Sequence, residues 1–204
     1  IRNRDSEPER IVNAEGKFLE LMNRLQGVTG PATSQPPAPA FNGPKIALLK
    51  QELIDLSLLE PQPRGYAFEK FLKALFDVYG MEARDAFRLR GEQIDGSFLL
   101  GHETYLLEAK WQNAKTGQDD LHGFHGKLEQ KAAWSRGLFI SNSGFTDDGL
   151  YAFGRGKRVI CMDGLDLYES MNRQIPLNHV LERKVRHAAE TGAPFASMRM
   201  LFPA

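Results

Sequence analysis

The sequence predicts an α/β sandwich in which helices cover a central mixed β-sheet. The first observation is a hairpin pattern, in which two strand-like runs, Gln93 to Leu100 and Thr104 to Trp111, flank the turn-rich Gly101-His102-Glu103. The second is a pair of short apolar segments, residues 137–141 and 158–162, that have the composition of buried strands. The third is the alternation of these segments with amphipathic helices. This order implies layers of helices packed on a sheet.

The N-terminal part of the chain divides into three segments. Residues 1–28 predict an amphipathic helix, because Ser6-Glu7-Pro8-Glu9 has the pattern of a capping box with proline in the first turn. Residues 29–44 contain five prolines and little charge, which favours an extended linker. Residues 45–62 predict a helical extension that ends at Pro61-Gln62-Pro63.

Residues 63–165 contain the predicted sheet and form the expected core, and residues 166–204 form a C-terminal helical extension. A helix is expected from about Gly65, with Gly80 as its cap, and Thr146 is expected to cap a short helix. The other expected elements are strands at 81–90, 93–100, 104–111, 137–141 and 158–162, and helices at 117–134, 163–171 and 176–190.

The composition is that of a water-soluble globular protein, with 42% hydrophobic and 25% charged residues in 204. Lys plus Arg and Asp plus Glu both total 26, so no overall field draws the chain to nucleic acid or membrane. No apolar stretch approaches the roughly 20 residues that span a bilayer, and we expect no membrane association. The single cysteine, Cys161, lies in an apolar run and fits a core position in a cytoplasmic protein.

The hairpin places charged side chains on one surface of the sheet. Side chains alternate along a strand, so Glu108 and Lys110 must share a face with Leu106. Antiparallel pairing can bring Asp95 next to Glu108, and Gly96 after it allows close approach of another backbone or a ligand. Two acidic groups and one lysine therefore converge, and a helix-borne Glu69 is consistent with the same site.

The Glu-x-Lys spacing occurs four times, at Glu15/Lys17, Glu108/Lys110, Glu129/Lys131 and Glu182/Lys184. At Glu15/Lys17, Glu129/Lys131 and Glu182/Lys184 the surrounding residues are polar and have helical character, which favours a solvated helix surface. The copy at Glu108 interrupts an apolar strand, where burying charge costs several kcal/mol unless a partner, metal or ligand compensates it. The structural alternative is a Glu108–Lys110 ion pair on a solvent-facing edge.

Four motifs together resemble the Mrr-like catalytic domain of restriction endonucleases, within the PD-(D/E)xK nuclease superfamily. They are Arg64-Gly65-Tyr66-Ala67-Phe68-Glu69, Gln93-Ile94-Asp95-Gly96, Glu108-Ala109-Lys110-Trp111 and residues 137–145. The resemblance covers residues 63–165 and implies a restriction-endonuclease-like α/β/α sandwich. Two positions depart from the pattern. Ile94 stands where the superfamily name has proline, and Glu108 where many Mrr-like members have glutamine.

The resemblance implies that Asp95 and Glu108 bind a metal ion and that Lys110 acts on the nucleophilic water or the transition state. Glu69 matches a helix glutamate that is a further acidic member in several branches, and it is expected to bind the metal through water or to hold Lys110. The main-chain carbonyl of Ala109 is a further expected ligand. Mg²⁺ suits such oxygen donors, with Mn²⁺ as a possible substitute.

Other candidate residues lie on the helix expected after the hairpin. His122, His125 and Lys127 predict either a phosphate-contacting patch beside the site or an ordinary solvated helix face. The two histidines lack the cysteines or third histidine that would indicate zinc. Trp111 and Trp134 are expected in the core rather than as stacking platforms for bases.

The expected function is that of a Mg²⁺-dependent DNA endonuclease in restriction, defence or DNA processing. A homodimer is expected, because cutting both strands generally needs two sites. The alternatives are a structure-selective nuclease similar to Holliday junction resolvases, a non-catalytic DNA-binding or assembly module on the same fold, and an unrelated α/β enzyme in which Lys110 only pairs with Glu108.

Overall fold

We analysed a computed structural model of the protein, which describes residues 42–89 and 91–203. The helix expected in residues 1–28 and most of the proline-rich linker expected in residues 29–44 lie outside the described residues. The described residues all belong to one unit, Pro39–Ala204.

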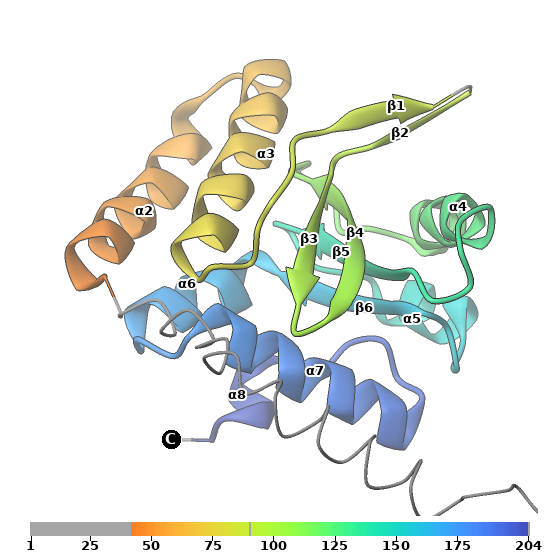
Figure 1. The fold of residues 1–204 in the computed structure, drawn as a ribbon. Helices are drawn as coiled ribbons and strands as arrows, with labels where there is room; N and C mark the ends of the chain where they lie inside the picture. Colours follow the sequence, from red (N-terminus) through yellow and green to blue (C-terminus); the bar gives the residue numbers. More distant parts are fainter. Residues whose placement is uncertain (1–41, 90, 204) are drawn as a thin grey trace, which may run out of the picture. The chain divides into compact units, whose positions relative to one another are not determined.

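A mixed sheet lies at the centre of this unit, as the sequence predicts (Figure 1). The strand order is β3-β4-β5-β6, in which β3 is antiparallel to β4 and the other two pairs are parallel. The antiparallel register places Gly96 opposite Leu107. A second, two-stranded ribbon pairs β1 with β2. The strands are β1 Phe87–Leu89, β2 Glu92–Ile94, β3 Gly96–Leu100, β4 Glu103–Lys110, β5 Arg136–Ser141 and β6 Val159–Asp163.

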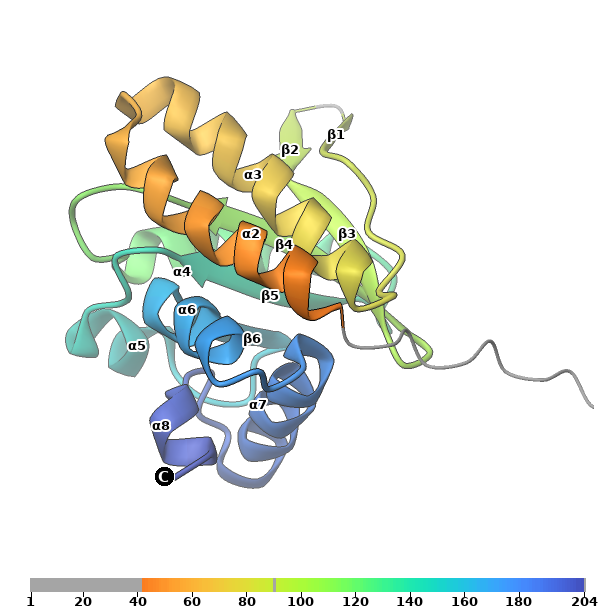
Figure 2. The same cartoon turned by 90° about the vertical axis from the view of Figure 1, so that its left-hand side faces the viewer.

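Helices cover both faces of the sheet and form two apolar clusters. Leu107 belongs to the larger cluster, on the face covered by α2, α3, α6 and α7 (Figure 2). Leu106, its neighbour in the strand, belongs to the smaller cluster on the face covered by α4 and α5. The helices are α2 Gly43–Asp55, the 3₁₀ turn η1 Leu56–Leu58, α3 Pro61–Val78, α4 Gln118–Glu129, α5 Asp147–Phe153, α6 Gly164–Asn172, α7 Leu177–Thr191 and α8 Met198–Leu201.

Several expected boundaries are wrong for local reasons. Pro61 begins α3 instead of ending the preceding helix, because proline fits the first turn, where its missing N–H is not needed. The strand expected over residues 81–90 is reduced to β1, and Arg84 makes only an isolated bridge to Ser97. The strand expected from Gln93 to Leu100 divides at Asp95, where β2 leaves the sheet to pair with β1.

Other expectations are confirmed. Thr146 caps α5 by accepting a hydrogen bond from the Gly149 N–H at 3.0 Å. Cys161 is fully buried, and burial raises the pKa of its thiol to about 12. Trp111 is partly buried and packs against the core, edge-on to Phe68 with 5.0 Å between ring centroids. Trp134 is the exception, because it follows the end of α4 and is 79% exposed.

The expectation that Lys184 lies on a solvated helix surface is wrong, because its side chain is buried in the C-terminal part of the fold. Its ammonium is 2.5 Å from an Asp166 carboxylate oxygen and donates hydrogen bonds to the carbonyls of Ala196 and Cys161, at 2.6 and 3.2 Å. It also lies 4.9 Å from the centre of the Phe195 ring. A buried ammonium persists only when such partners compensate it.

Within residues 42–89 and 91–203, no helix has the length and apolar character that crossing a bilayer requires.

Candidate active site

The end of β4 carries Glu108 and Lys110 on the face of the sheet that α4 covers. This direction follows from the alternation of the strand, in which Leu106 packs into the cluster under α4 and Leu107 into the cluster under α3. The prediction that Glu108 and Lys110 share the face of Leu106 is therefore consistent with the structure. Both side chains are partly buried.

Asp95 lies beside Glu108, at the point where β2 ends and β3 begins. Its N–H donates to the Leu107 carbonyl at 3.1 Å, which extends the β3–β4 pairing by one residue. Its carboxylate accepts from the Ala109 N–H at 3.0 Å and from the Gln93 side-chain amide at 3.3 Å. Asp95 is half-buried at the edge of the sheet, so its carboxylate is fixed without being sealed in the core.

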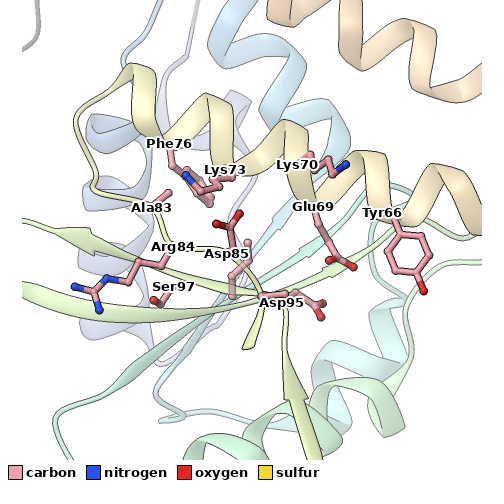
Figure 3. Close-up of a pocket in the computed structure, with 12 residues that line it drawn as sticks. Tyr66, Glu69, Lys70, Lys73, Phe76, Ala83, Arg84, Asp85, Asp95 and Ser97 are labelled. Carbon is pink, nitrogen blue, oxygen red and sulfur yellow. The ribbon is translucent and has the colours of Figure 1, made fainter. Parts of the chain in front are cut away.

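Glu69 reaches the same region from α3. Figure 3 shows the Glu69 and Asp95 carboxylates on the same side of a pocket, with the ring of Tyr66 next to them. Burial, together with the negative charges of Asp95 and Glu108, raises the pKa of Glu69 to about 7. The three carboxylates are therefore close enough to repel one another.

The pocket has a volume of about 210 Å³ and lies between α3 and the start of β3. Lys70 and Arg84, both exposed, supply positive charge to its walls. Glu108 and Lys110 are not among its lining residues, since they face α4. Asp95 and Glu69 thus connect this pocket to the charged end of β4.

Helix α4 pairs with both charged residues of that strand. The Lys127 ammonium is 2.7 Å from a Glu108 carboxylate oxygen, and Lys110 forms an ion pair with Asp120. Burial raises the pKa of Glu108, while the hydrogen bond from Lys127 acts in the opposite direction. The described ion pairs do not include one between Glu108 and Lys110, so the structural alternative of a simple pair within the strand is wrong.

The three residues suggested for phosphate contact, Lys127, His122 and His125, have different neighbours in the structure. Lys127 joins the candidate active site through Glu108. The rings of His122 and His125 pack edge-on against Phe153 of α5, at centroid distances of 5.3 and 5.9 Å. Burial lowers the pKa of His125. The two histidine rings therefore take part in the packing of α4 against α5.

A known protein family matches this part of the chain. A family model described as restriction endonuclease, the Mrr catalytic domain, matches residues 62–171. The chain belongs to this Mrr-type restriction endonuclease family. The match covers α3 from its second residue, the whole four-stranded sheet and the four candidate residues Glu69, Asp95, Glu108 and Lys110. The restriction-endonuclease-like fold expected from the sequence is confirmed.

Three solved structures are similar to this Mrr-type chain. One is a protein of unknown function designated AF1548, with 18% identity and a TM-score of 0.44, covering 60% of this chain and 78% of that one. Protein VC1899 from Vibrio cholerae has 10% identity and a TM-score of 0.38, covering 65% and 50%. The MspJI restriction endonuclease in complex with a 27-mer oligonucleotide has 14% identity and a TM-score of 0.42, covering 82% and 41%.

At such low identities and TM-scores, the assignment depends on the family match. This chain spans 50% of the Vibrio cholerae protein and 41% of the MspJI enzyme. Curated proteins yield no match to the chain.

The donors of this Mrr-type site fit a hard divalent cation in their chemistry. Glu69, Asp95 and Glu108 offer carboxylate oxygens, which Mg²⁺ prefers, and a cation would offset both the burial and the neighbouring negative charges that raise the pKa of Glu69. In the part of the chain that the structure describes, no three Asp, Glu, His or Cys side chains are gathered as a ready-made metal site. Cation binding would therefore require these carboxylates to reorient.

Sequence reasoning suggested Lys127 of α4 as a phosphate contact beside the site, but it missed Asp120 and the ion pairs that both residues make. Asp120 lies in the first turn of that helix, where acidic residues are common for reasons of helix polarity alone. Neither its pairing with Lys110 nor that of Lys127 with Glu108 has a local signal. Both depend on how α4 crosses the sheet.

Proposed function

We propose that the protein is a Mg²⁺-dependent DNA endonuclease that hydrolyses phosphodiester bonds. The observation that carries this proposal is the convergence of Asp95 and Glu108 across the β3–β4 pairing, with Lys110 on the same face of β4. The family match independently indicates a nuclease domain over these residues. Mn²⁺ is expected to substitute for Mg²⁺.

The carboxylates would hold the cation. Asp95, Glu108 and the Ala109 carbonyl supply oxygen donors, and Glu69 contributes directly or through a water molecule. When bound, the cation supplies Lewis-acid stabilisation of the phosphoryl and leaving oxygens. The Ala109 N–H keeps Asp95 oriented toward the end of β4.

Lys110 would act on the water and on the developing charge. Its ammonium is compact and mobile, which suits a group that orients the attacking water and offsets negative charge on the phosphate. Asp120 pairs with this ammonium and restricts where it can point. Removing Lys110 is therefore expected to abolish cleavage while leaving DNA binding.

Partners and context follow from the reaction. DNA is the proposed substrate, and a homodimer would place two sites on the two strands of a duplex. A role in restriction, defence or DNA processing suits the family. The single cysteine of the sequence, Cys161, is buried as a free thiol, which suits the reducing cytoplasm.

The presence of Glu69 beside Asp95 also supports a second candidate, a structure-selective nuclease similar to Holliday junction resolvases. The two candidates share the site and differ in substrate. Preference for branched over linear duplex DNA would favour the second candidate.

The test compares wild type with Lys110→Ala and Glu108→Ala on supercoiled plasmid, linear duplex and branched DNA in Mg²⁺. We expect cleavage by the wild type only, with retained DNA binding by Lys110→Ala. Lys131→Met serves as a control, since Lys131 follows the end of α4 and pairs with Glu92. Cleavage by Lys110→Ala at the wild-type rate would exclude the site. Wild-type binding without cleavage would identify a non-catalytic module.

A further inference from the structure

Helix α4 places a positive charge directly on one of the proposed metal ligands. The Lys127 ammonium is 2.7 Å from the Glu108 carboxylate, and the two side chains are only 27% and 13% exposed. At this distance the contact is a charge-assisted hydrogen bond as well as an ion pair. One oxygen of Glu108 is therefore engaged by a cation that belongs to the protein.

A divalent cation and Lys127 need the same carboxylate. Both interact with Glu108 by electrostatic attraction to its oxygens, and an ammonium held on one oxygen reduces the negative charge that the carboxylate offers to a cation. The positive charge of Lys110, which also lies near Glu108, adds to this effect. Two ammonium groups beside a cation site weaken cation binding by simple repulsion.

Lys127 has an alternative partner once substrate arrives. Its four-carbon side chain is flexible, and its ammonium is a strong partner for phosphate. The phosphate backbone of DNA would approach the same carboxylates, if the proposed function is correct. Moving the ammonium from Glu108 to a phosphate exchanges one ion pair for another.

We propose that Lys127 acts as a gate on the metal site, occupying Glu108 until a DNA phosphate draws it away. This proposal depends on the function proposed above. It has the consequence that cation binding and DNA binding reinforce each other, because each favours the arrangement in which Lys127 has left Glu108. Such coupling is reciprocal, so either ligand tightens the other by the same factor.

The chain provides a matched control one turn further along. Lys131 also forms an ion pair from the α4 side, with Glu92, and these side chains are 16% and 11% exposed. Lys131→Met therefore removes the same charge and a similarly buried pair, but its partner is not one of the proposed ligands. Lys127→Arg keeps the positive charge and the pairing with Glu108.

The first experiment titrates Mn²⁺ into the full chain without DNA, by isothermal calorimetry. Lys127→Met should bind Mn²⁺ about five- to tenfold more tightly than wild type, the change expected when an ion pair of about 1 kcal/mol no longer competes. Lys131→Met and Lys127→Arg should remain within about twofold of wild type. Circular dichroism checks that each variant is folded, and Lys127→Gln replaces Lys127→Met if that variant is not.

The second experiment measures the affinity of the protein for a short DNA duplex with and without Ca²⁺. Ca²⁺ is a hard cation and serves as the probe that occupies the proposed metal site. Ca²⁺ should strengthen DNA binding by the wild type, and this strengthening should shrink in Lys127→Met. A third readout is amine labelling followed by mass spectrometry. Adding Mn²⁺ should increase the labelling of Lys127 and leave that of Lys131 unchanged.

The outcomes separate the two proposals. Equal or weaker Mn²⁺ binding by Lys127→Met, or labelling of Lys127 that does not respond to Mn²⁺, would overturn the gate while leaving the nuclease site intact. Absence of Mn²⁺ binding in both wild type and Lys127→Met would remove the metal site itself, and with it the proposed function. Binding by Lys127→Met alone would support the gate strongly.

Discussion

The Ala109 N–H donates a hydrogen bond to the Asp95 carboxylate at 3.0 Å, which joins the residue between Glu108 and Lys110 to the start of the neighbouring strand. This contact holds the Asp95 carboxylate beside Glu108 and limits how far it can turn. Two different replacements of Asp95 can separate the effect of this hydrogen bond on stability from the effect of the carboxylate charge on cleavage.

Asp95→Asn and Asp95→Ala should differ in stability and agree in activity. The asparagine carbonyl can still accept from the Ala109 N–H, whereas alanine leaves this partly buried donor without its partner, at a cost of about 1 to 2 kcal/mol. Both variants lose the negative charge proposed to bind the cation. We expect cleavage to fall by about a hundredfold or more in both, while urea unfolding shows a clear loss only for Asp95→Ala. Near-normal cleavage by Asp95→Asn would contradict the proposed ligand role.

Gly96→Ala should destabilise the start of β3. A Cβ at this position would lie 2.9 Å from the Arg84 carbonyl oxygen, which confirms the expectation that another backbone approaches Gly96 closely. Because that oxygen belongs to the backbone, relief requires the chain to move, and we expect a loss of about 1 to 3 kcal/mol in urea unfolding. Gly123→Ala in α4 is the control. Its Cβ would meet nothing within 4 Å, so this change should stabilise the helix slightly.

Glu69→Gln should change how stability depends on pH. The folded-state pKa of Glu69 is about 7 against an ordinary 4.5, so between these values the folded protein holds a proton that the unfolded chain has released. Stability of the wild type should therefore fall as pH rises through this range. Because the carboxyl is only half-buried and water screens it, we expect Glu69→Gln to be about 1 kcal/mol more stable at pH 8.

The difference in stability between Glu69→Gln and the wild type should vanish near pH 4, where Glu69 is largely protonated in both the folded and the unfolded state. Denaturant unfolding across pH 4 to 8 provides the measurement. Parallel stability curves for the two proteins would show that neither burial nor the charges of Asp95 and Glu108 raise the pKa of Glu69. Added Mg²⁺ should reduce the difference at pH 8, since a bound cation relieves the same repulsion.

Lys184→Met should be strongly destabilising. The substitution leaves the buried Asp166 carboxylate without its cation, for which we expect a loss of about 3 to 5 kcal/mol in urea unfolding. Arg186→Met, which breaks the exposed pair with Glu190 on the same helix, should change little. Similar effects of the two substitutions would contradict the buried role of Lys184.

Sequence patterns predicted those parts of the fold that depend on local periodicity or turn chemistry. The pairing of β3 with β4 follows from alternation around a glycine turn, and the start of α5 follows from the capping ability of Thr146. The division of the first hairpin arm at Asp95 has a weak local signal, because Asp and Gly in Asp95-Gly96 are uncommon inside strands. The pairing of β2 with β1 has no such signal in residues 93–100 themselves.

The candidate site shows the same limit. Asp95, Glu108 and Lys110 could be placed together because strand pairing has a fixed geometry. The pairs Lys127–Glu108 and Lys110–Asp120 depend on the position of a helix across the sheet, which residue spacing does not encode. Lys184 was misjudged because lysine is rarely buried, and its compensating partners come from distant parts of the chain.

The contacts of Lys184 bear on how small a folding piece of this protein can be. The family match ends at residue 171, yet Asp166 within it accepts hydrogen bonds from Lys184 and from the Met198 N–H, at 2.5 and 2.6 Å. A chain shortened to the matched segment would expose the Asp166 carboxylate. It would also expose the apolar side chains that Leu177, Val180, Leu181 and Met198 cover in the full fold. The autonomous unit therefore extends at least to Met198, well past the segment by which the family is identified.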